Sequence, residues 1–153
     1  MDKRGEFNAA MKEAMKNSNK IAVATIRLIL AALKDKDIVA RAEGKAEGIS
    51  ENEILSMLQS MIKQRKESSK TYAEAERFDL AEREETEIKI IQTFLPQQLD
   101  EDEAGEAIDA LIKEMDAQDI KDMGRVMAEL KTRFAGQMDM GKASGLVKQK
   151  LAA

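Results

Sequence analysis

The sequence predicts an all-α protein, on the basis of its composition and the spacing of its apolar residues. The chain has 153 residues, of which 43% are hydrophobic. It is rich in Ala, Leu, Lys, Glu and Met, which favour helices. Apolar residues recur three and four positions apart in every long segment, whereas runs of β-branched residues between turn residues are missing. A sheet is therefore not expected, and the length suits one ordinary domain or two small ones.

Four helices are predicted before the single proline. A first amphipathic helix ends at Asn17-Ser18-Asn19. A second, over about residues 20–40, is apolar on nearly every side, which is typical of a buried central helix. Ser50 and Glu53 form an S-x-x-E capping box that begins the third helix. The fourth helix ends before Pro96.

We place a domain boundary at Pro96. Residues 1–95 are expected to form an N-terminal helical bundle, and residues 96–153 a smaller C-terminal domain of three helices. Acidic residues from Asp100 onward suit the start of the first of these three, because a helix N-terminus favours negative charge. Gly136 ends the next helix and Asp139 caps the last.

Charge is distributed unevenly along the chain. Residues 1–95 hold 17 basic and 17 acidic side chains, and residues 96–122 hold 2 basic and 10 acidic ones. Residues 123–153 hold 6 basic and 2 acidic side chains, a net charge of +4. The acidic total argues against broad binding of nucleic acids, while the basic end allows one small phosphate-contacting patch.

The chain contains neither His nor Cys, and this excludes several classes of site. A Ser-His-Asp triad, a Cys-His pair and the usual zinc sites all need one of these residues. We therefore predict no catalytic site, no metal and no cofactor. The lack of Cys agrees with a reducing compartment. With no signal-peptide pattern and no apolar run long enough to span a bilayer, a cytoplasmic location away from membranes is expected.

Two short motifs resemble catalytic or nucleotide-binding signatures but lack their context. Gly136, Gly141 and Lys142 have P-loop spacing, yet Ala143 stands where a P-loop needs Ser or Thr, and a helix is predicted where a strand should precede. Ser68-Ser69-Lys70 resembles an amidase triad. Such amidases need large scaffolds, so we interpret these three residues as polar helix surface.

Two arginines occupy the apolar faces of predicted helices. Arg65 lies among the apolar positions of the third helix and Arg27 within the apolar run of the second. Such an Arg must reach solvent or pair with a carboxylate, and Glu84 and Glu87 on the fourth helix are the expected partners. We interpret these four residues as a structural ion pair. The other glutamates nearby diverge around the helix, so a metal site is not expected there.

Several motifs, spread over most of the chain, occur in a characteristic order. They are Thr25-Ile26-Arg27-Leu28, Lys63-Gln64-Arg65-Lys66-Glu67-Ser68, Asp79-Leu80-Ala81, Phe94-Leu95-Pro96-Gln97-Gln98-Leu99, Asp122-Met123-Gly124-Arg125-Val126-Met127 and Asp139-Met140-Gly141-Lys142. In this order they resemble the free-standing proteins of the GatB/YqeY family. The sequence departs from the family pattern at Glu76, where Gly is common, and at Gln137 and Met138, where a basic residue and Ala are common.

The resemblance implies two helical domains similar to the tail of the B subunit of tRNA-dependent amidotransferase. In that enzyme the tail helps to hold tRNA. The chemistry, that of a carbon–nitrogen ligase with glutamine as amido-N-donor, lies in other domains and subunits. The resemblance therefore implies a non-catalytic accessory module. Its implied partners are tRNA and amidotransferase or synthetase proteins, and DNA is not expected.

The basic end of the chain supplies the candidate RNA contacts. They are the side chains of Arg125, Lys131, Arg133, Lys142 and Lys148, together with the backbone N–H groups at Gly141. A protein-interaction adaptor is the alternative function. A self-contained amidotransfer enzyme is the weakest hypothesis, because the sequence offers no credible nucleophile, base or nucleotide site.

Overall fold

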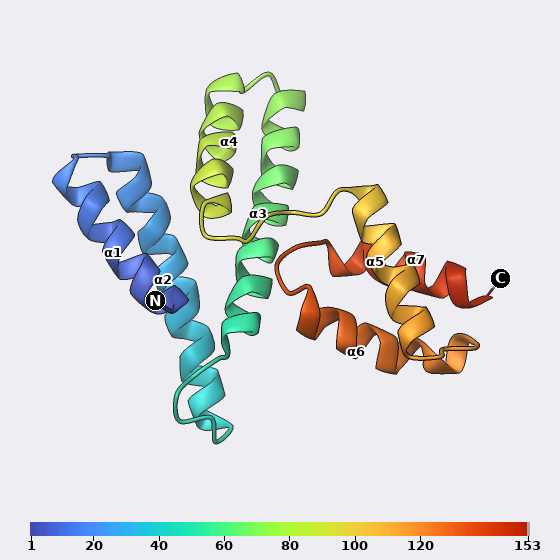
Figure 1. Cartoon of the computed structure of the whole chain (residues 1–153). Helices are drawn as coiled ribbons and strands as arrows, with labels where there is room; N and C mark the ends of the chain where they lie inside the picture. The colour runs from blue at the N-terminus through green and yellow to red at the C-terminus, as the bar shows by residue number, and fades with distance from the viewer. Residues whose placement is uncertain (153) are drawn as a thin grey trace. The chain divides into compact units, whose positions relative to one another are not determined.

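The computed structural model describes residues 1–152, and across them it contains seven α-helices, one 3-10 turn and no strand (Figure 1). The all-α class predicted from the sequence is thereby confirmed. In chain order the elements are α1 (Lys3–Lys16), α2 (Lys20–Ala42), α3 (Glu51–Glu74), α4 (Phe78–Gln92), α5 (Glu101–Glu114), η1 (Ile120–Asp122), α6 (Met123–Arg133) and α7 (Met140–Ala152). None of these described helices is long and apolar enough to cross a membrane.

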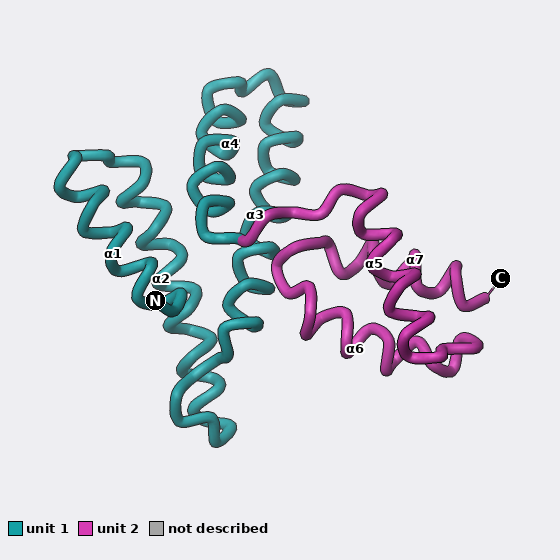
Figure 2. The backbone as a smooth tube through the Cα atoms, in the orientation of Figure 1, with its two compact units in different colours: residues 1–95 teal, residues 96–153 magenta. Residues whose placement is uncertain are grey.

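The chain divides into two compact units, Met1–Leu95 and Pro96–Ala153 (Figure 2). The first unit consists of two helical hairpins, α1 with α2 and α3 with α4 (Figure 1). Its core holds fully buried side chains from each helix, including Phe7, Ile29, Leu58 and Ile91. Burial of a side chain of this size stabilises the fold by about 1.5–3 kcal/mol. Phe7 and Phe94 meet edge to face with ring centroids 4.9 Å apart, which joins the two ends of the unit.

Helix α2 is buried on one side only, which differs from the sequence expectation. Ile26, Ile29 and Leu33 face the core, but Leu28 and Ile38 are 48% and 53% exposed. The other three helices of the unit cover the core-facing side, and the opposite side of α2 faces away from them. The apolar residues on that side are therefore not explained by the core of this unit.

The loop between α2 and α3 is fixed by the buried carboxylate of Asp37. Its Oδ1 accepts hydrogen bonds from the Ile49 N–H at 2.8 Å and from Arg4 Nη2 at 2.7 Å. Burial raises the pKa of Asp37, but the Ile49 N–H and the Arg4 guanidinium outweigh burial and hold that pKa below its ordinary value. Gly48 passes close by with φ of +85°, and a Cβ there would collide with the Asp37 carboxylate. Only glycine suits this position.

The second unit packs α5, α6 and α7 around a separate core. Its fully buried side chains include Ile108, Val126, Leu130 and Val147. The segment before α5 is bonded to the α6–α7 loop, since the Leu99 N–H donates to the Gln137 carbonyl at 2.9 Å. Met138 is only 5% exposed, so the departure from the family's Ala fills space in this core.

Helix ends follow the predicted capping residues. Ser50 and Glu53 form a reciprocal capping box at the start of α3, as predicted, and Asp100 forms one with Glu103 at α5. Gly136 adopts φ of +75°, which suits its place just after α6. Glu76 also adopts a left-handed conformation, with φ of +60°, after the end of α3. This geometry explains why glycine is common there in the family.

Candidate functional site

Arg125 forms an ion pair and a backbone hydrogen bond within the C-terminal unit. Its Nε lies 3.0 Å from Asp122 Oδ1, and its Nη1 donates to the Met115 carbonyl at 2.9 Å. Hydrogen bonds from the Gln118 N–H, and then from Arg125, lower the pKa of Asp122. Arg125 thus ties the start of α6 to the end of α5, a structural role that differs from the RNA contact expected from the sequence.

Arg133 is paired with carboxylates. Its two Nη atoms donate to the Glu114 carboxylate at 2.7 and 2.9 Å, and its Nε donates to Glu129 at 2.7 Å. These hydrogen bonds, that to Glu114 first, raise the pKa of Arg133. Lys150 similarly lies 2.6 Å from Asp109. The acidic helix α5 therefore neutralises much of the basic excess that the sequence shows.

The start of α7 is capped from within the chain. Asp139 Oδ1 accepts hydrogen bonds from the backbone N–H groups of Gly141 at 2.8 Å and of Lys142 at 3.2 Å. A carboxylate thus already occupies the position that a phosphate would take at this helix start. The backbone contact expected at Gly141 would require displacement of Asp139.

Three of the candidate RNA-binding side chains have no partner among the described residues. Lys131 on α6 and Lys142 and Lys148 on α7 are exposed. Their ammonium groups form no hydrogen bond or ion pair with any residue between 1 and 152. They are the cations of α6 and α7 that are free to meet an external anion, whereas the other basic side chains of residues 123–152 are paired.

The structure brings Arg65 and Glu87 together between α3 and α4. Arg65 Nε lies 3.1 Å from Glu87 Oε2, and the two side chains are 13% and 10% exposed. Arg65 Nη1 also donates to the Met61 carbonyl at 3.1 Å, and Arg83 lies 3.5 Å from the other Glu87 oxygen. This arrangement joins the two helices of the hairpin through a nearly buried pair.

The structure places Arg27 and Glu84 outside that pair. Arg27 is exposed on the outward side of α2 and has no ion pair among the described residues, because the core-facing side of the helix lies away from it. Glu84 is half-buried, and burial, followed by the charge of Glu87, raises its pKa against the opposing charge of Arg65. The sequence left open whether Glu84 or Glu87 pairs with a buried arginine, and in the structure Glu87 pairs with Arg65.

Ser69 is buried, where polar surface was expected. Its hydroxyl donates to Glu85 Oε1 at 2.9 Å and lies 3.4 Å from the Ala81 carbonyl. The serine therefore connects α3 to α4. In residues 1–152 no group of three or more acidic side chains is placed to hold a metal ion.

Comparison with known families decides where the chain belongs. The family model described as Yqey-like protein matches residues 4–151. The chain belongs to the YqeY-like family.

Curated relatives of this YqeY-like chain include proteins named "Altered inheritance of mitochondria protein 41, mitochondrial". The relative from Vanderwaltozyma polyspora is 34% identical over 97 residues, which cover 59% of this chain and 50% of the relative. That from Lachancea thermotolerans is also 34% identical over 97 residues, with 63% and 50% covered. That from Clavispora lusitaniae is 34% identical over 112 residues, with 71% and 62% covered. The YqeY-like chain thus spans about half the length of the first two relatives.

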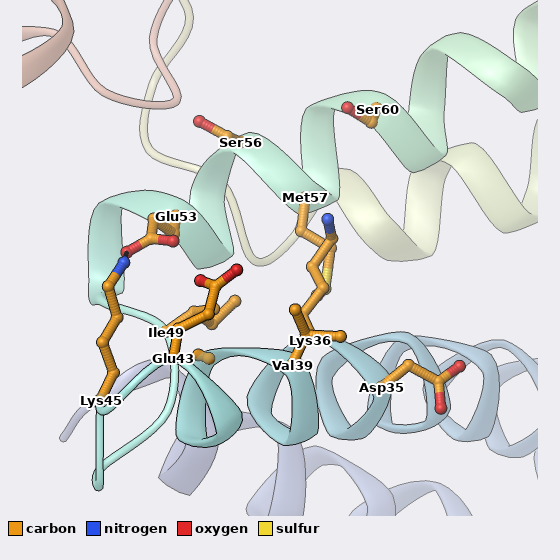
Figure 3. Close-up of a pocket in the computed structure, with 11 residues that line it drawn as sticks. Asp35, Lys36, Val39, Glu43, Lys45, Ile49, Glu53, Ser56, Met57 and Ser60 are labelled. Atoms are coloured by element: carbon orange, nitrogen blue, oxygen red, sulfur yellow. Dashed lines mark ion pairs between the residues drawn. The ribbon is translucent and has the colours of Figure 1, made fainter.

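A groove of about 500 Å³ opens between the C-terminal part of α2 and the start of α3 (Figure 3). Its lining combines the apolar Ile49 and Met57 with charged side chains. In Figure 3 Lys45 points to Glu53, and their charged atoms lie 3.5 Å apart. The charged residues that line the groove are of both signs, and they form no convergent catalytic group.

Sequence reasoning missed the contact of Arg4 with Asp37. These residues are 33 positions apart, so no local pattern predicts their meeting. The available signal was Asp37 itself, a carboxylate on the largely apolar core-facing side of α2. A charge at such a position requires a partner.

Proposed function

We propose that this YqeY-like chain is a non-catalytic accessory module that contacts tRNA through lysines of residues 123–153. The proposal rests on the family membership, because the family resembles the tail of the amidotransferase B subunit and that tail helps to hold tRNA. The observation that carries the proposal is the contrast between the paired arginines and the unpaired Lys131, Lys142 and Lys148.

The chemistry of these lysines favours contact with the phosphate backbone. An ammonium group acts as a point charge on a flexible stem, and each phosphate contact releases a counterion. The chain has one Tyr and no Trp, so stacking on bases has little support and base-specific recognition is not proposed. Three free cations support modest affinity that falls at moderate salt.

The absence of His and Cys from the sequence supports a role without chemistry of its own. In this proposal the module assists amidotransferase or synthetase proteins that carry out the reaction. A cytoplasmic location forms part of the proposal, although the named relatives are mitochondrial proteins.

A filter-binding titration of the full chain with total tRNA, at low and moderate salt, tests the proposal. The variant Lys131→Gln/Lys142→Gln/Lys148→Gln should bind more weakly and flatten the salt slope by roughly 2–3 units. The matched control is Lys63→Gln/Lys66→Gln/Lys70→Gln, which removes three exposed lysines from α3. This control should retain the wild-type slope.

Two results would contradict the proposal. One is an equal loss of tRNA binding in both triple variants, which would show that binding depends on the total charge and not on the position of the lysines. The other is no binding of tRNA by the wild-type chain at low salt. Either result would favour the protein-interaction adaptor instead.

A further inference from the structure

The side of α2 that faces away from the core carries an apolar stripe. At 100° per residue this side lies opposite the buried Ile26, Ile29 and Leu33. The stripe has heptad spacing and consists of Ile21, Ala24, Leu28, Ala31 and Ile38, with Asp35 at the one heptad position among them that is not apolar. Leu28 and Ile38 are about half exposed, and neither belongs to the core of the N-terminal unit. An outward helix side normally carries polar residues, so this stripe calls for a partner.

A line of four cations runs along one edge of the stripe. They are Lys20, Arg27, Lys34 and Arg41, spaced seven residues apart and all exposed. Arg41 donates to the Ala46 carbonyl at 3.3 Å, whereas the other three side chains make no hydrogen bond or ion pair within residues 1–152.

The helix itself does not neutralise this line. Surface helices usually place a carboxylate three or four positions from a cation. Around Arg27 those positions are Val23, Ala24, Leu30 and Ala31. Near Lys34 the carboxylate of Asp37 is buried and already bonded to Arg4. Lys20, Arg27 and Lys34 are therefore unpaired positive charges beside an apolar stripe, whereas the charge of Arg41 acts on Asp37.

We propose that this side of α2 is a docking surface for an acidic amphipathic helix of a partner protein. A helix with a matching heptad stripe would cover the apolar residues, and glutamates on its flank would meet the four cations. Ala24 and Ala31 are small, which lets a second helix approach to the usual 8–10 Å between axes. This surface lies on the N-terminal unit, so the inference goes beyond the proposed RNA contact.

Other occupants fit this surface less well. RNA would meet the cations but leave the aliphatic stripe unused, and the stripe has no aromatic ring for stacking. A bilayer would have to accept Asp35, which lies within the stripe between Ala31 and Ile38. A second copy in antiparallel pairing would bring two lines of cations together, and in parallel pairing the cations would face Ala32 and Val39.

Fluorescence anisotropy with the full chain and two synthetic peptides tests the inference. The first probe is a helix of roughly four heptads with Leu at the core positions and Glu at the flanks. The second has Lys in place of each Glu. The acidic peptide should bind with a dissociation constant of about 10 µM, because one helix face is a small interface. The basic peptide should bind at least about tenfold more weakly.

Two variants locate the binding, each checked for helix content by circular dichroism. Arg27→Glu/Lys34→Glu leaves the line with no net charge and should abolish the preference between the peptides, whereas the control Lys63→Glu/Lys66→Glu on α3 should keep it. Leu28→Ser should weaken the acidic peptide by about tenfold through loss of apolar contact. A folded Arg27→Glu/Lys34→Glu variant that keeps the wild-type preference would overturn the inference.

Parallel measurements distinguish the other occupants. Anionic lipid vesicles and total tRNA are titrated against the same wild-type and variant chains, and sedimentation measures self-association. Equal binding of both peptides would overturn the proposal. It would also be overturned if the acidic peptide fails to bind while vesicles, tRNA or a second copy bind the wild-type chain and lose that binding in Leu28→Ser. If tRNA binding is lost only in Lys131→Gln/Lys142→Gln/Lys148→Gln, the result concerns the proposed function. It leaves this inference in place.

Discussion

Three groups from distant parts of the chain meet at Asp37. The guanidinium of Arg4 and the N–H of Ile49 both bond to its carboxylate, and Gly48 leaves space for it. The pKa of Asp37 lies below its ordinary value in the folded chain. Ionised Asp37 therefore contributes stability above the unfolded pKa of about 4, and that contribution is lost as the pH falls.

Asp37→Asn should accordingly lower the free energy of unfolding at pH 7 by about 1.5–3 kcal/mol, the range for hydrogen bonds to charged groups. The difference between wild type and variant should shrink as the pH falls from about 4 through the lower pKa of folded Asp37, because the wild-type carboxylate then binds a proton. Urea unfolding at several pH values measures this. Asp35→Asn, on the same helix but exposed, is the control. A difference that stays constant down to the lowest pH at which the chain remains folded would contradict the role given to the charge.

Arg65 lies among the apolar positions of one helix face and Arg27 within an apolar run of sequence, yet they have different surroundings. Arg65→Ala should cost about 3–5 kcal/mol, since it leaves the nearly buried Glu87 without its close partner. Arg27→Ala should change stability by less than about 0.5 kcal/mol, as is usual for exposed positions. Chemical denaturation of both variants provides the measurement. A loss below about 1 kcal/mol for Arg65→Ala would mean that the pair behaves as an exposed one.

The sequence could predict that Arg65 needs a carboxylate, because helical spacing placed it among apolar residues. It could not predict that Arg27 faces outward. Helix α2 is apolar on both sides, and periodicity alone does not say which side the other helices cover. The contact of Arg133 with Glu114 was also beyond reach, since these residues are 19 positions apart. The pairs of Arg125 with Asp122 and of Arg133 with Glu129 have the local spacing of helical ion pairs, which the sequence does show.

At the scale of the elements, the end of α3 carries a strained residue. Glu76 has φ of +60°, a conformation that costs a residue with a Cβ about 1–2 kcal/mol. Glu76→Gly should therefore raise the free energy of unfolding by about 1 kcal/mol, after allowance for the greater freedom of glycine in the unfolded chain. Thermal unfolding would show a higher midpoint temperature.

Asp116 offers a comparison for this effect. It has φ of +50° beyond the end of α5, but Asp tolerates this region better than Glu does. Asp116→Gly should consequently give a smaller gain than Glu76→Gly. A decrease in stability for Glu76→Gly would show that contacts of the Glu76 side chain outweigh its backbone strain.

Helix boundaries were predictable where a cap marks them. The capping box at Ser50, the proline at position 96 and the cap at Asp139 all correspond to ends of observed helices or turns. The turn η1 was not predicted, because its three residues are too short for periodicity to detect. The long-range ion pairs around the candidate interface, Arg133 with Glu114 and Lys150 with Asp109, were likewise hidden, because they depend on tertiary contacts.

For the whole molecule, the unpaired cations assign the two proposed contacts to two different units. The N-terminal unit offers an apolar stripe with a row of cations on α2, and the C-terminal unit offers three unpaired lysines beside otherwise paired charges. Net charge alone did not distinguish these surfaces, because it counts Arg125 and Arg133 equally with Lys131. The ion pairs of the structure make that distinction.

Backbone amide chemical shifts of the isotope-labelled full chain, followed during titration with total tRNA at low salt, show directly whether the C-terminal unit contacts tRNA. We expect the shifts to concentrate around Lys131, Lys142 and Lys148, and to reverse as salt is added. Signals of α3, including those near Lys63, should stay in place. Shifts confined to residues 1–95, or none at low salt, would contradict the claim that the C-terminal unit contacts tRNA.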